Sequence, residues 1–331
     1  MSKFDKDTGR DEFFVQRDKE VNSLVDPATS KVRADLVEKV DCPLCGQNDF
    51  TVLFSKHGFD FGRCRHCTLV YVNPRLQEEA LIKHYNDKDT FNDLAIQFMD
   101  SPKQREVNEA LYDTFFAKLG RPARGAKFLD VGCSAGFLLN YARNKGYDVY
   151  GLELNEQACE LAEKNYGIKP QKKLLENCDY PDNSFDVISM IGVVEHLPHP
   201  LDTLKIVHRL LQPGGVFIGQ VPNVQSLVVM VLHQLSRTFT GRDHLVYYSQ
   251  KTLHDLFKRV GFSTVETFTQ FHGRDSILNY FQLLDPFGAE NYDFLPQAFK
   301  NWILDPENFK KIENKMHELG LGLKMEFITR K

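Results

Sequence analysis

Four of the seven cysteines stand in two close pairs near the beginning of the chain. Cys42 and Cys45 form one C-x-x-C pair, and the second pair consists of Cys64 and Cys67. Two such pairs at this separation are the ligand pattern of a zinc ribbon. Because four thiolates complete the tetrahedral shell of Zn²⁺, the predicted ion is structural and has no open position for a substrate. The alternative is a set of free or redox-active cysteines.

A run of small residues follows an expected buried strand at 127–131. This run, Gly132–Gly136, allows a ligand to approach the backbone closely, and the helix after it offers free N–H groups. It differs from the G-x-G-x-x-G pattern of dinucleotide enzymes, and Asp130 just before it would repel a pyrophosphate but attract an ammonium group. Glu153 ends the next expected strand, where a carboxylate can hold ribose hydroxyls. The pattern therefore indicates a ligand with a ribose and an amino-acid part.

Titratable side chains also follow the expected strand at 185–191. His196 comes shortly after that strand, and an imidazole there can take a proton near neutral pH or orient an acceptor. The alternative is a structural histidine that bonds a neighbouring loop. His244 and Tyr247 stand just before an expected helix and are candidate contacts of the acceptor, or simple packing residues.

Strands and helices alternate along the second half of the chain and would position these side chains. We expect strands at 127–131, 148–153, 185–191, 216–221, 265–271 and 323–329, and helices at 137–145, 156–166, 200–211 and 251–260. This alternation predicts βαβ units and a mostly parallel sheet. Ligands of such sheets bind beyond the carboxyl ends of the strands, where the candidate residues lie.

The order of the motifs from residue 122 onward resembles that of the class I S-adenosylmethionine-dependent methyltransferases, in their small-molecule branch. The motifs are LDVGCSAG, GLELN, PDNSFDVIS, VVEHLPHP, LLQPGGVFIGQVPN and HLVYYSQKTLHDLFKRVGF. The resemblance implies an α/β fold, with a Rossmann-like, mostly parallel seven-stranded sheet flanked by helices. It also implies S-adenosyl-L-methionine as the cofactor and S-adenosyl-L-homocysteine as the product. One departure is Ser134, where the family more often has glycine.

The resemblance also assigns the cofactor contacts residue by residue. The methionine part would be held at the end of the expected strand 127–131. The ribose and adenine would be held at the end of the strand 148–153 and at 176–177, and the backbone at the end of the strand 185–191 would line the methionine end. The residues implied are, in that order, Asp130, Gly132, Cys133, Ser134 and Gly136, then Glu153, Leu154, Glu176 and Asn177, then Met190, Ile191 and Gly192.

The segment from Cys67 to Arg75, followed by an expected helix and Tyr85, extends the resemblance. It is similar to methyltransferases with an N-terminal zinc ribbon that act in sugar, polysaccharide or natural-product pathways. The expected organisation is a helical or partly disordered segment (1–40), a zinc ribbon (41–73), a helical connector (74–121) and a methyltransferase domain (122–331). Within this last domain, 225–250 and 271–320 are expected as inserts on the acceptor side.

Composition narrows the function classes. The 331 residues, 42% of them hydrophobic, suffice for one large α/β domain and a small module. A formal net charge of −4 counts against a nucleic-acid partner, because surfaces that bind phosphate backbones carry a basic excess. The chain has no apolar stretch of about 18 residues and begins with charged residues, so we expect no transmembrane segment, no secretory signal and a cytoplasmic protein.

The function expected first is methyl transfer to a small-molecule acceptor, at an oxygen, nitrogen or carbon of a sugar, a polysaccharide precursor or a secondary metabolite. An RNA methyltransferase that contacts RNA through the ribbon is the alternative, and a non-catalytic binding protein of the same fold is a third hypothesis. The apolar stretch Ser226–Leu235 leaves four interpretations open. It could be a lid over the acceptor, the face of a homodimer, a lipid-facing patch or a buried helix.

Overall fold

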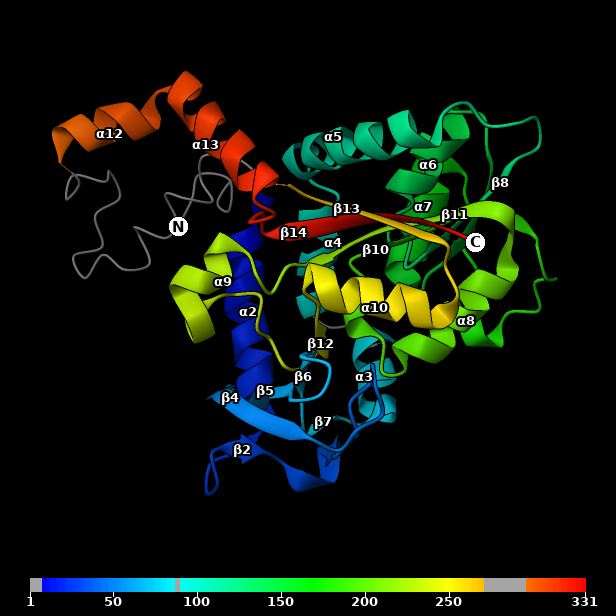
Figure 1. The fold of residues 1–331 in the computed structure, drawn as a ribbon. Coiled ribbons are helices and arrows are strands. Elements are labelled where there is room, and N and C mark those ends of the chain that lie inside the picture. Colours follow the sequence, from blue (N-terminus) through cyan, green and yellow to red (C-terminus); the bar gives the residue numbers. More distant parts are fainter. Residues whose placement is uncertain (1–7, 87–89, 271–295) are drawn as a thin grey trace.

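The computed structural model describes residues 8–86, 90–270 and 296–331. Its largest sheet has six strands in the order β13-β14-β11-β10-β8-β9 (Figure 1). The four neighbours β9, β8, β10 and β11 are parallel, and only β14 runs against its neighbours. The bounds are Lys127–Val131 for β8, Asp148–Leu152 for β9, Phe185–Ile191 for β10, Leu211–Pro222 for β11, Thr264–Gln270 for β13 and Lys324–Arg330 for β14. The mostly parallel α/β sheet predicted from the sequence is confirmed.

One edge of this sheet is shorter than expected. The described residues form six strands in place of seven, and beyond β9 a single parallel bridge joins Leu152 to Gln171. A segment that makes only one bridge has no ladder to extend, so it does not count as a strand. This bridge still fixes the chain beside the end of β9, where Glu153 N–H bonds to the Gln171 carbonyl at 3.1 Å.

Helices cover both faces of the sheet, as Figure 1 shows. One face carries α5 (Pro102–Leu119), α6 (Phe137–Asn144) and α7 (Glu156–Tyr166), and the other carries α8 (Pro200–Leu210) and α10 (Gln250–Val260). Successive residues of a strand point to opposite faces, so Phe217 packs in one core and Ile218 in the other. On the first face, the rings of Phe116 and Phe128 stack with centroids 5.8 Å apart.

Local sequence signals explain where these helices begin and end. Asn155 caps α7 by accepting from the Ala158 N–H at 3.0 Å, and Gly167 ends it with a left-handed φ of 65°. A capping box of Ser249 and Thr252 starts α10. Each large apolar side chain that such a helix buries against the sheet contributes about 1.5–3 kcal/mol to the free energy of unfolding.

The cysteine-bearing segment forms a second sheet with four antiparallel strands in the order β12-β6-β5-β4. Its strands are β4 (Phe50–Lys56), β5 (Phe59–Cys64), β6 (Val70–Val72) and β12 (Val246–Tyr247). The last strand comes from the larger domain, with Val246 paired to Tyr71 and Tyr247 to Val70. The ribbon is therefore joined to the larger domain by backbone hydrogen bonds and a shared core.

Six further α-helices and two short strand pairs lie in the described part of the chain. They are α2 (Arg10–Ser23), α3 (Glu78–Asn86), α4 (Thr90–Met99), α9 (Leu227–Leu232), α12 (Gln297–Leu304) and α13 (Pro306–Glu318), with short pairs β1 (Val25–Asp26) with β2 (Lys31–Val32) and β3 (Val37–Glu38) with β7 (Arg75–Leu76). Helix α2 falls within the segment 1–40, and helices α3 to α5 fall within 74–121. No described helix is long and apolar enough to cross a bilayer.

Two expectations about inserts have different outcomes. The apolar stretch after β11 forms α9, which buries Val228 and Leu232 but exposes Met230 and Val231. It is therefore a half-buried helix. The second expected insert begins at residue 271, and its first part, 271–295, lies outside the described residues.

Candidate functional site

A cavity of about 2180 Å³ opens at the carboxyl ends of β8, β9 and β10. Ligand pockets commonly measure about 300–1,000 Å³, so this one has room for a cofactor and an acceptor together. Its floor is the loop after β8 and the ends of β9 and β10. Helices α2, α4, α5 and α13 supply apolar and aromatic walls, among them Phe14, Phe98, Leu111 and Phe309.

The loop after β8 turns sharply at the edge of this cavity. Gly132 and Gly136 have left-handed φ angles of 76° and 79°, and Ser134 between them has 46°. The N–H groups of Gly132 and Cys133 bond to the Leu152 carbonyl at 2.8 and 3.0 Å, which ties the loop to β9. A left-handed conformation costs a residue with a side chain about 1–2 kcal/mol, so Ser134 carries strain that a glycine would avoid.

Glu153 is held by this loop at the end of β9. Its Oε2 accepts from the Ser134 N–H and its Oε1 from the Asn155 N–H, both at 2.8 Å. Burial raises the pKa of the Glu153 carboxyl, although these backbone donors act against the shift. Each carboxylate oxygen has two lone pairs, so both can still accept from a pair of ligand hydroxyls.

Asp130 lies at the end of β8, only 3% exposed. The Ser189 hydroxyl donates to its Oδ1 at 2.7 Å. Burial raises its pKa from 3.8 to about 7, and the negative charge of Glu153 adds to the shift. The structure has no cation paired with Asp130 among the described residues, and a ligand ammonium would favour its ionised form.

A cluster of titratable side chains lines the cavity after β10 and before β12. Glu195 and His196 belong to the short turn η3 (Val194–His196) after β10, and His244 comes from the segment before β12. The imidazoles of His196 and His244 meet edge to face with centroids 4.8 Å apart. His196 Nδ1 lies 2.8 Å from the Tyr85 hydroxyl, and His244 Nδ1 lies 3.0 Å from the Thr238 carbonyl. Burial and the neighbouring His196 lower the pKa of His244 to about 3.

Most of the site residues predicted from the sequence line this one cavity. Those that line it are Asp130, Gly132, Cys133, Ser134, Glu153, Leu154, Glu176, Asn177, Ile191, Gly192, His196 and His244. Gly136 lies behind the loop, where an added Cβ would be 3.0 Å from Ala162 Cβ. Met190 is fully buried in the core between the sheet and its helices.

Tyr247 differs from its predicted placement. It is 1% exposed, and its ring packs against Phe61 and Phe239 beside the ribbon sheet. Its hydroxyl donates to the His244 carbonyl at 2.9 Å. The structure therefore places Tyr247 outside the cavity as a packing residue, because β12 must turn this ring into the ribbon core.

Among the lining residues without a predicted role are three polar ones near the carboxyl edge of the sheet or the histidine pair. Tyr85 from α3 supports His196, and Gln220 and Lys324 line the wall beside it. Tyr85 had appeared only as part of the family resemblance, since nothing in the local sequence shows that it meets a residue 111 positions away. Gln220 on β11 precedes a loop at the carboxyl edge of the sheet, which is a weak but usable signal.

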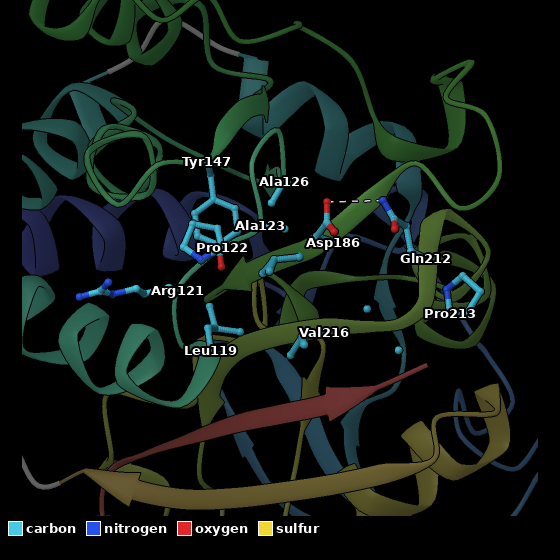
Figure 2. Close-up of a pocket in the computed structure, with 13 residues that line it drawn as sticks. Leu119, Arg121, Pro122, Ala123, Ala126, Tyr147, Asp186, Gln212, Pro213 and Val216 are labelled. Carbon is cyan, nitrogen blue, oxygen red and sulfur yellow. Dashed lines mark hydrogen bonds between the residues drawn. The ribbon is translucent and has the colours of Figure 1, made fainter.

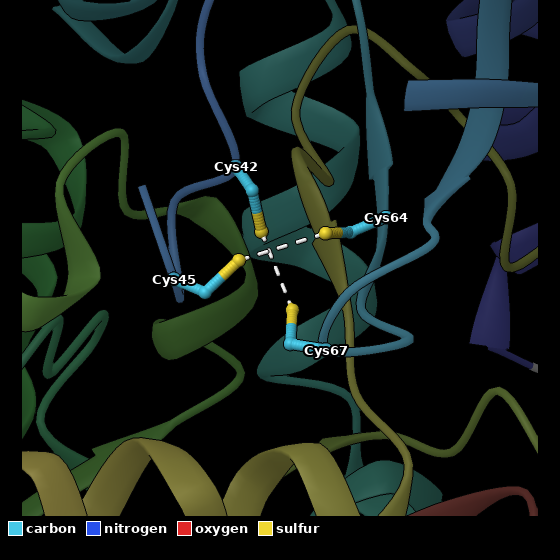
Figure 3. Close-up of side chains that lie close together, drawn as sticks. All are labelled: Cys42, Cys45, Cys64 and Cys67. Carbon is cyan, nitrogen blue, oxygen red and sulfur yellow. Dashed lines mark hydrogen bonds between the residues drawn. The ribbon is translucent and has the colours of Figure 1, made fainter. Parts of the chain in front are cut away.

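The four cysteines of the ribbon converge on one point (Figure 3). Cys42 Sγ lies 3.5 Å from Cys67 Sγ, and Cys45 Sγ lies 3.5 Å from Cys64 Sγ. All four sulfur atoms lie within 4.8 Å of one another. A tetrahedral zinc ion with Zn–S bonds of about 2.3 Å separates its sulfur ligands by about 3.8 Å. The arrangement is therefore compatible with zinc.

A second, smaller cavity of about 180 Å³ lies at the opposite edge of the large sheet (Figure 2). It is lined by the residues before β8 and at the beginning of β10 and β11, among them Asp186 and Gln212. Asp186 already accepts from the Lys127 N–H at 2.7 Å and from Gln212 at 3.4 Å. Because ligands of these sheets bind at the carboxyl edge, this cavity is not the functional site.

Comparison with known proteins agrees with this geometry. A family model described as a methyltransferase domain matches residues 101–267. The matched region is half of the chain, so the chain belongs to this family, and the expectation of a class I S-adenosylmethionine-dependent methyltransferase is confirmed.

Curated relatives share the methyltransferase domain at low identity. A ubiquinone biosynthesis O-methyltransferase of Thiobacillus denitrificans is 29% identical over 145 residues, which cover 41% of this chain and 59% of that protein. A protein of the same name from Xanthomonas campestris pv. campestris is 25% identical over 188 residues, covering 52% of this chain and 77% of that protein. The chain thus spans little more than half the length of the first of these relatives.

Two solved structures share the fold. A S-adenosylmethionine-dependent methyltransferase from Archaeoglobus fulgidus superposes with a TM-score of 0.50 at 18% identity, covering 73% of this chain and all of that one. Haemonchus contortus phosphoethanolamine N-methyltransferase 2, solved with phosphomonomethylethanolamine and S-adenosylhomocysteine, gives 0.52 at 14% identity, covering 85% and 70%. At such identities, the likeness concerns the fold alone.

Proposed function

We propose that the protein transfers a methyl group from S-adenosylmethionine to a small-molecule acceptor. The observation that carries the proposal is the arrangement of one cavity. It brings together the buried carboxyl of Asp130, the half-buried carboxyl of Glu153, a tight backbone turn between them in the sequence, and the pair His196 and His244. The two carboxyls suit an amino acid and a ribose, and the two histidines suit an acceptor.

The cofactor contacts follow from the chemistry of each group. The Asp130 carboxylate would pair with the ammonium of the methionine part, and the backbone of Gly132–Ser134 would approach its carboxylate. Glu153 would accept from both ribose hydroxyls, since both of its oxygens keep free lone pairs. Leu154 would pack on the adenine, and Glu176 or Asn177 would face its amine. The backbone at Ile191 and Gly192 would then line the methionine end.

Methyl transfer itself needs position more than it needs bond-forming side chains. The sulfonium S–CH₃ bond breaks, its electron pair stays on sulfur, and a lone pair of the acceptor forms the new bond to the methyl carbon. For a hydroxyl acceptor the O–H proton leaves to a base, either His196 or the solvent. The contribution of the protein is to hold both molecules in line and to exclude water with its aromatic walls.

A sugar, a polysaccharide precursor or a secondary metabolite is the acceptor class that we propose. Support comes from the apolar and aromatic walls of the cavity, the net charge of −4 and the O-methyltransferase name of the curated relatives. An RNA acceptor has less support, because two basic side chains of the ribbon already have protein partners. Its Arg65 lies 3.4 Å from Asp49, and its Lys56 is turned toward the Ser236 carbonyl at 2.8 Å.

We also propose that Cys42, Cys45, Cys64 and Cys67 hold a structural zinc ion. The sulfur separations suit a tetrahedral ion, and the four ligands leave no open position. The ion would stabilise the ribbon sheet and, through β12, the segment that carries His244.

The proposal is tested by assaying methyl transfer from methyl-labelled S-adenosylmethionine to pools of sugars, phenols and other metabolites. Formation of S-adenosylhomocysteine together with a labelled small product supports it. A labelled RNA and no labelled small molecule would favour the alternative. Cofactor binding without any labelled product across these pools would indicate a binding protein.

A further inference from the structure

Three potential metal ligands come together at the acceptor end of the cavity. They are Glu195, His196 and His244, and their ligand atoms lie within 4.8 Å of one another. Two of them come from the turn after β10 and the third from the segment before β12, so the fold brings together residues that are far apart in the sequence. The cluster is separate from the four cysteines of the ribbon.

One oxygen of the carboxylate in this cluster is buried without a hydrogen-bond partner among the described residues. Glu195 is 1% exposed, and its Oε2 has no hydrogen-bond partner in the described part of the chain. Lys324 lines the same cavity and lies close enough for the charge of Glu195 to raise its pKa against the opposing effect of burial, but it makes no hydrogen bond to this oxygen. A buried charge left without a partner is costly, so this oxygen is expected to face a cation or a donor that binds in the cavity.

Hydrogen bonds orient the two imidazoles as metal ligands are usually oriented. The Thr238 carbonyl can only accept, so His244 Nδ1 carries the proton and donates to it at 3.0 Å. Its Nε2 therefore keeps a free lone pair. His196 Nδ1 meets the Tyr85 hydroxyl at 2.8 Å, and when Nδ1–H donates to that oxygen its Nε2 is free as well. Histidine ligands of metals typically donate their second N–H in this way.

We propose that Glu195, His196 and His244 form a binding site for a divalent cation, with an open position toward the acceptor. Two imidazoles and one carboxylate are a donor set of catalytic Zn²⁺ sites and also of Fe²⁺ sites. Around a zinc ion with bonds of about 2.0–2.1 Å the ligand atoms stand about 3.3 Å apart, so small side-chain rotations close the present separations. The free Oδ1 of Asp243, also buried without a partner among the described residues, adds negative charge beside the site.

The role of the site rests on the proposed methyl transfer, whereas cation binding does not. A divalent cation there would polarise an acceptor oxygen and lower its pKa. Within this arrangement His196 orients the acceptor, and Tyr85 positions His196. The selected acceptor would then be one that offers an oxygen to the cation, such as a hydroxyl.

Equilibrium dialysis against Zn²⁺ tests the site directly, with metal content measured per chain. We expect roughly two ions for the wild type, one in the cysteines and one in the cavity. Glu195→Gln and His244→Gln should each weaken the second ion by roughly tenfold or more, as loss of even supporting groups does. His199→Gln, a histidine that lines the cavity outside the cluster, is the matched control and should keep both ions.

A measurement on the wild type alone guards against variants that fail to fold. When one equivalent of Zn²⁺ has filled the cysteines, added Co²⁺ should bind and give visible d–d bands without thiolate charge-transfer bands. Saturation at one ion per chain, or a second ion that survives in both variants, would overturn the proposal. If S-adenosylmethionine binds and the second ion does not, only the cation site is refuted. If the second ion binds and S-adenosylmethionine does not, only the methyltransferase proposal is refuted.

Discussion

The raised pKa of Asp130 makes cofactor binding dependent on pH. Burial raises this pKa from 3.8 to about 7 in the cofactor-free protein, and only the ionised carboxylate attracts an ammonium. The ionised fraction rises from about 0.1 near pH 6 to about 0.5 near pH 7, so the affinity for S-adenosylmethionine should rise roughly fivefold over that unit. The amine of the cofactor, with an ordinary pKa of about 7.7–8.0, stays mostly protonated in this window.

The stability of the cofactor-free protein should change with pH in the opposite direction to its affinity for the cofactor. A folded carboxyl with a raised pKa holds its proton more tightly than the unfolded chain does, so the cofactor-free fold loses stability as the pH rises from about 4 to about 7. Asp130→Asn removes the titrating group and should flatten both dependences.

Calorimetry at several pH values provides the assay. Asp130→Asn should also weaken binding near pH 7.5 by roughly 10- to 100-fold, which corresponds to loss of one charge-assisted hydrogen bond of about 1.5–3 kcal/mol. Asp148→Asn, an exposed aspartate at the beginning of β9, is the matched control and should behave like the wild type. If Asp130→Asn retains the pH slope of the wild type, then Asp130 does not contact the cofactor.

Three further predictions concern residues that support the cavity without lining it. Gly136→Ala should lower the free energy of unfolding by roughly 1–2 kcal/mol, because φ is 79° and the new Cβ would press on Ala162; chemical denaturation measures it, and an unchanged midpoint would contradict the strain argument. Cys42→Ser should remove the zinc ion from the ribbon and lower the melting temperature of the protein, as measured by metal analysis and calorimetry. The control Cys178→Ser should change neither quantity. Full zinc content in Cys42→Ser would refute the zinc site. Tyr247→Phe should lower the free energy of unfolding by about 0.5–1.5 kcal/mol, because the hydrogen bond to the His244 carbonyl is lost, and should leave cofactor affinity unchanged. A large loss of cofactor affinity in calorimetry would show that Tyr247 belongs to the binding site.

Local patterns were sufficient to predict much of the fold. The strands Lys127–Val131 and Phe185–Ile191 and the helix Glu156–Tyr166 have the bounds expected from the sequence, because each is a strongly patterned segment with clear turn or cap residues. The two cysteine pairs were equally readable, since their spacing reflects the geometry of one ion.

The relations between distant segments could not be read in this way. Strand β12 is two residues long and pairs with β6 about 175 positions earlier, and so short a pairing leaves no periodic signal. That pairing decides that Tyr247 faces the ribbon core while His244 faces the cavity. The contact between Tyr85 and His196 likewise depends on how α3 lies relative to the turn η3. The expected seventh strand is reduced to a single bridge at Gln171, and sequence patterns do not show how many hydrogen bonds such a segment makes.

The central claim is that this cavity binds S-adenosylmethionine through Glu153. Calorimetric titration of the nucleoside-free protein with S-adenosylmethionine and S-adenosylhomocysteine tests it. The same titrations are made on Glu153→Ala and on the control Glu156→Ala, an exposed residue in the first turn of α7. We expect saturable binding of both ligands to the wild type and to the control. Binding should be weakened by roughly 10-fold or more in Glu153→Ala, since two ribose contacts are lost. No heat from either ligand in the wild type, or equal affinity in both variants, would contradict this claim.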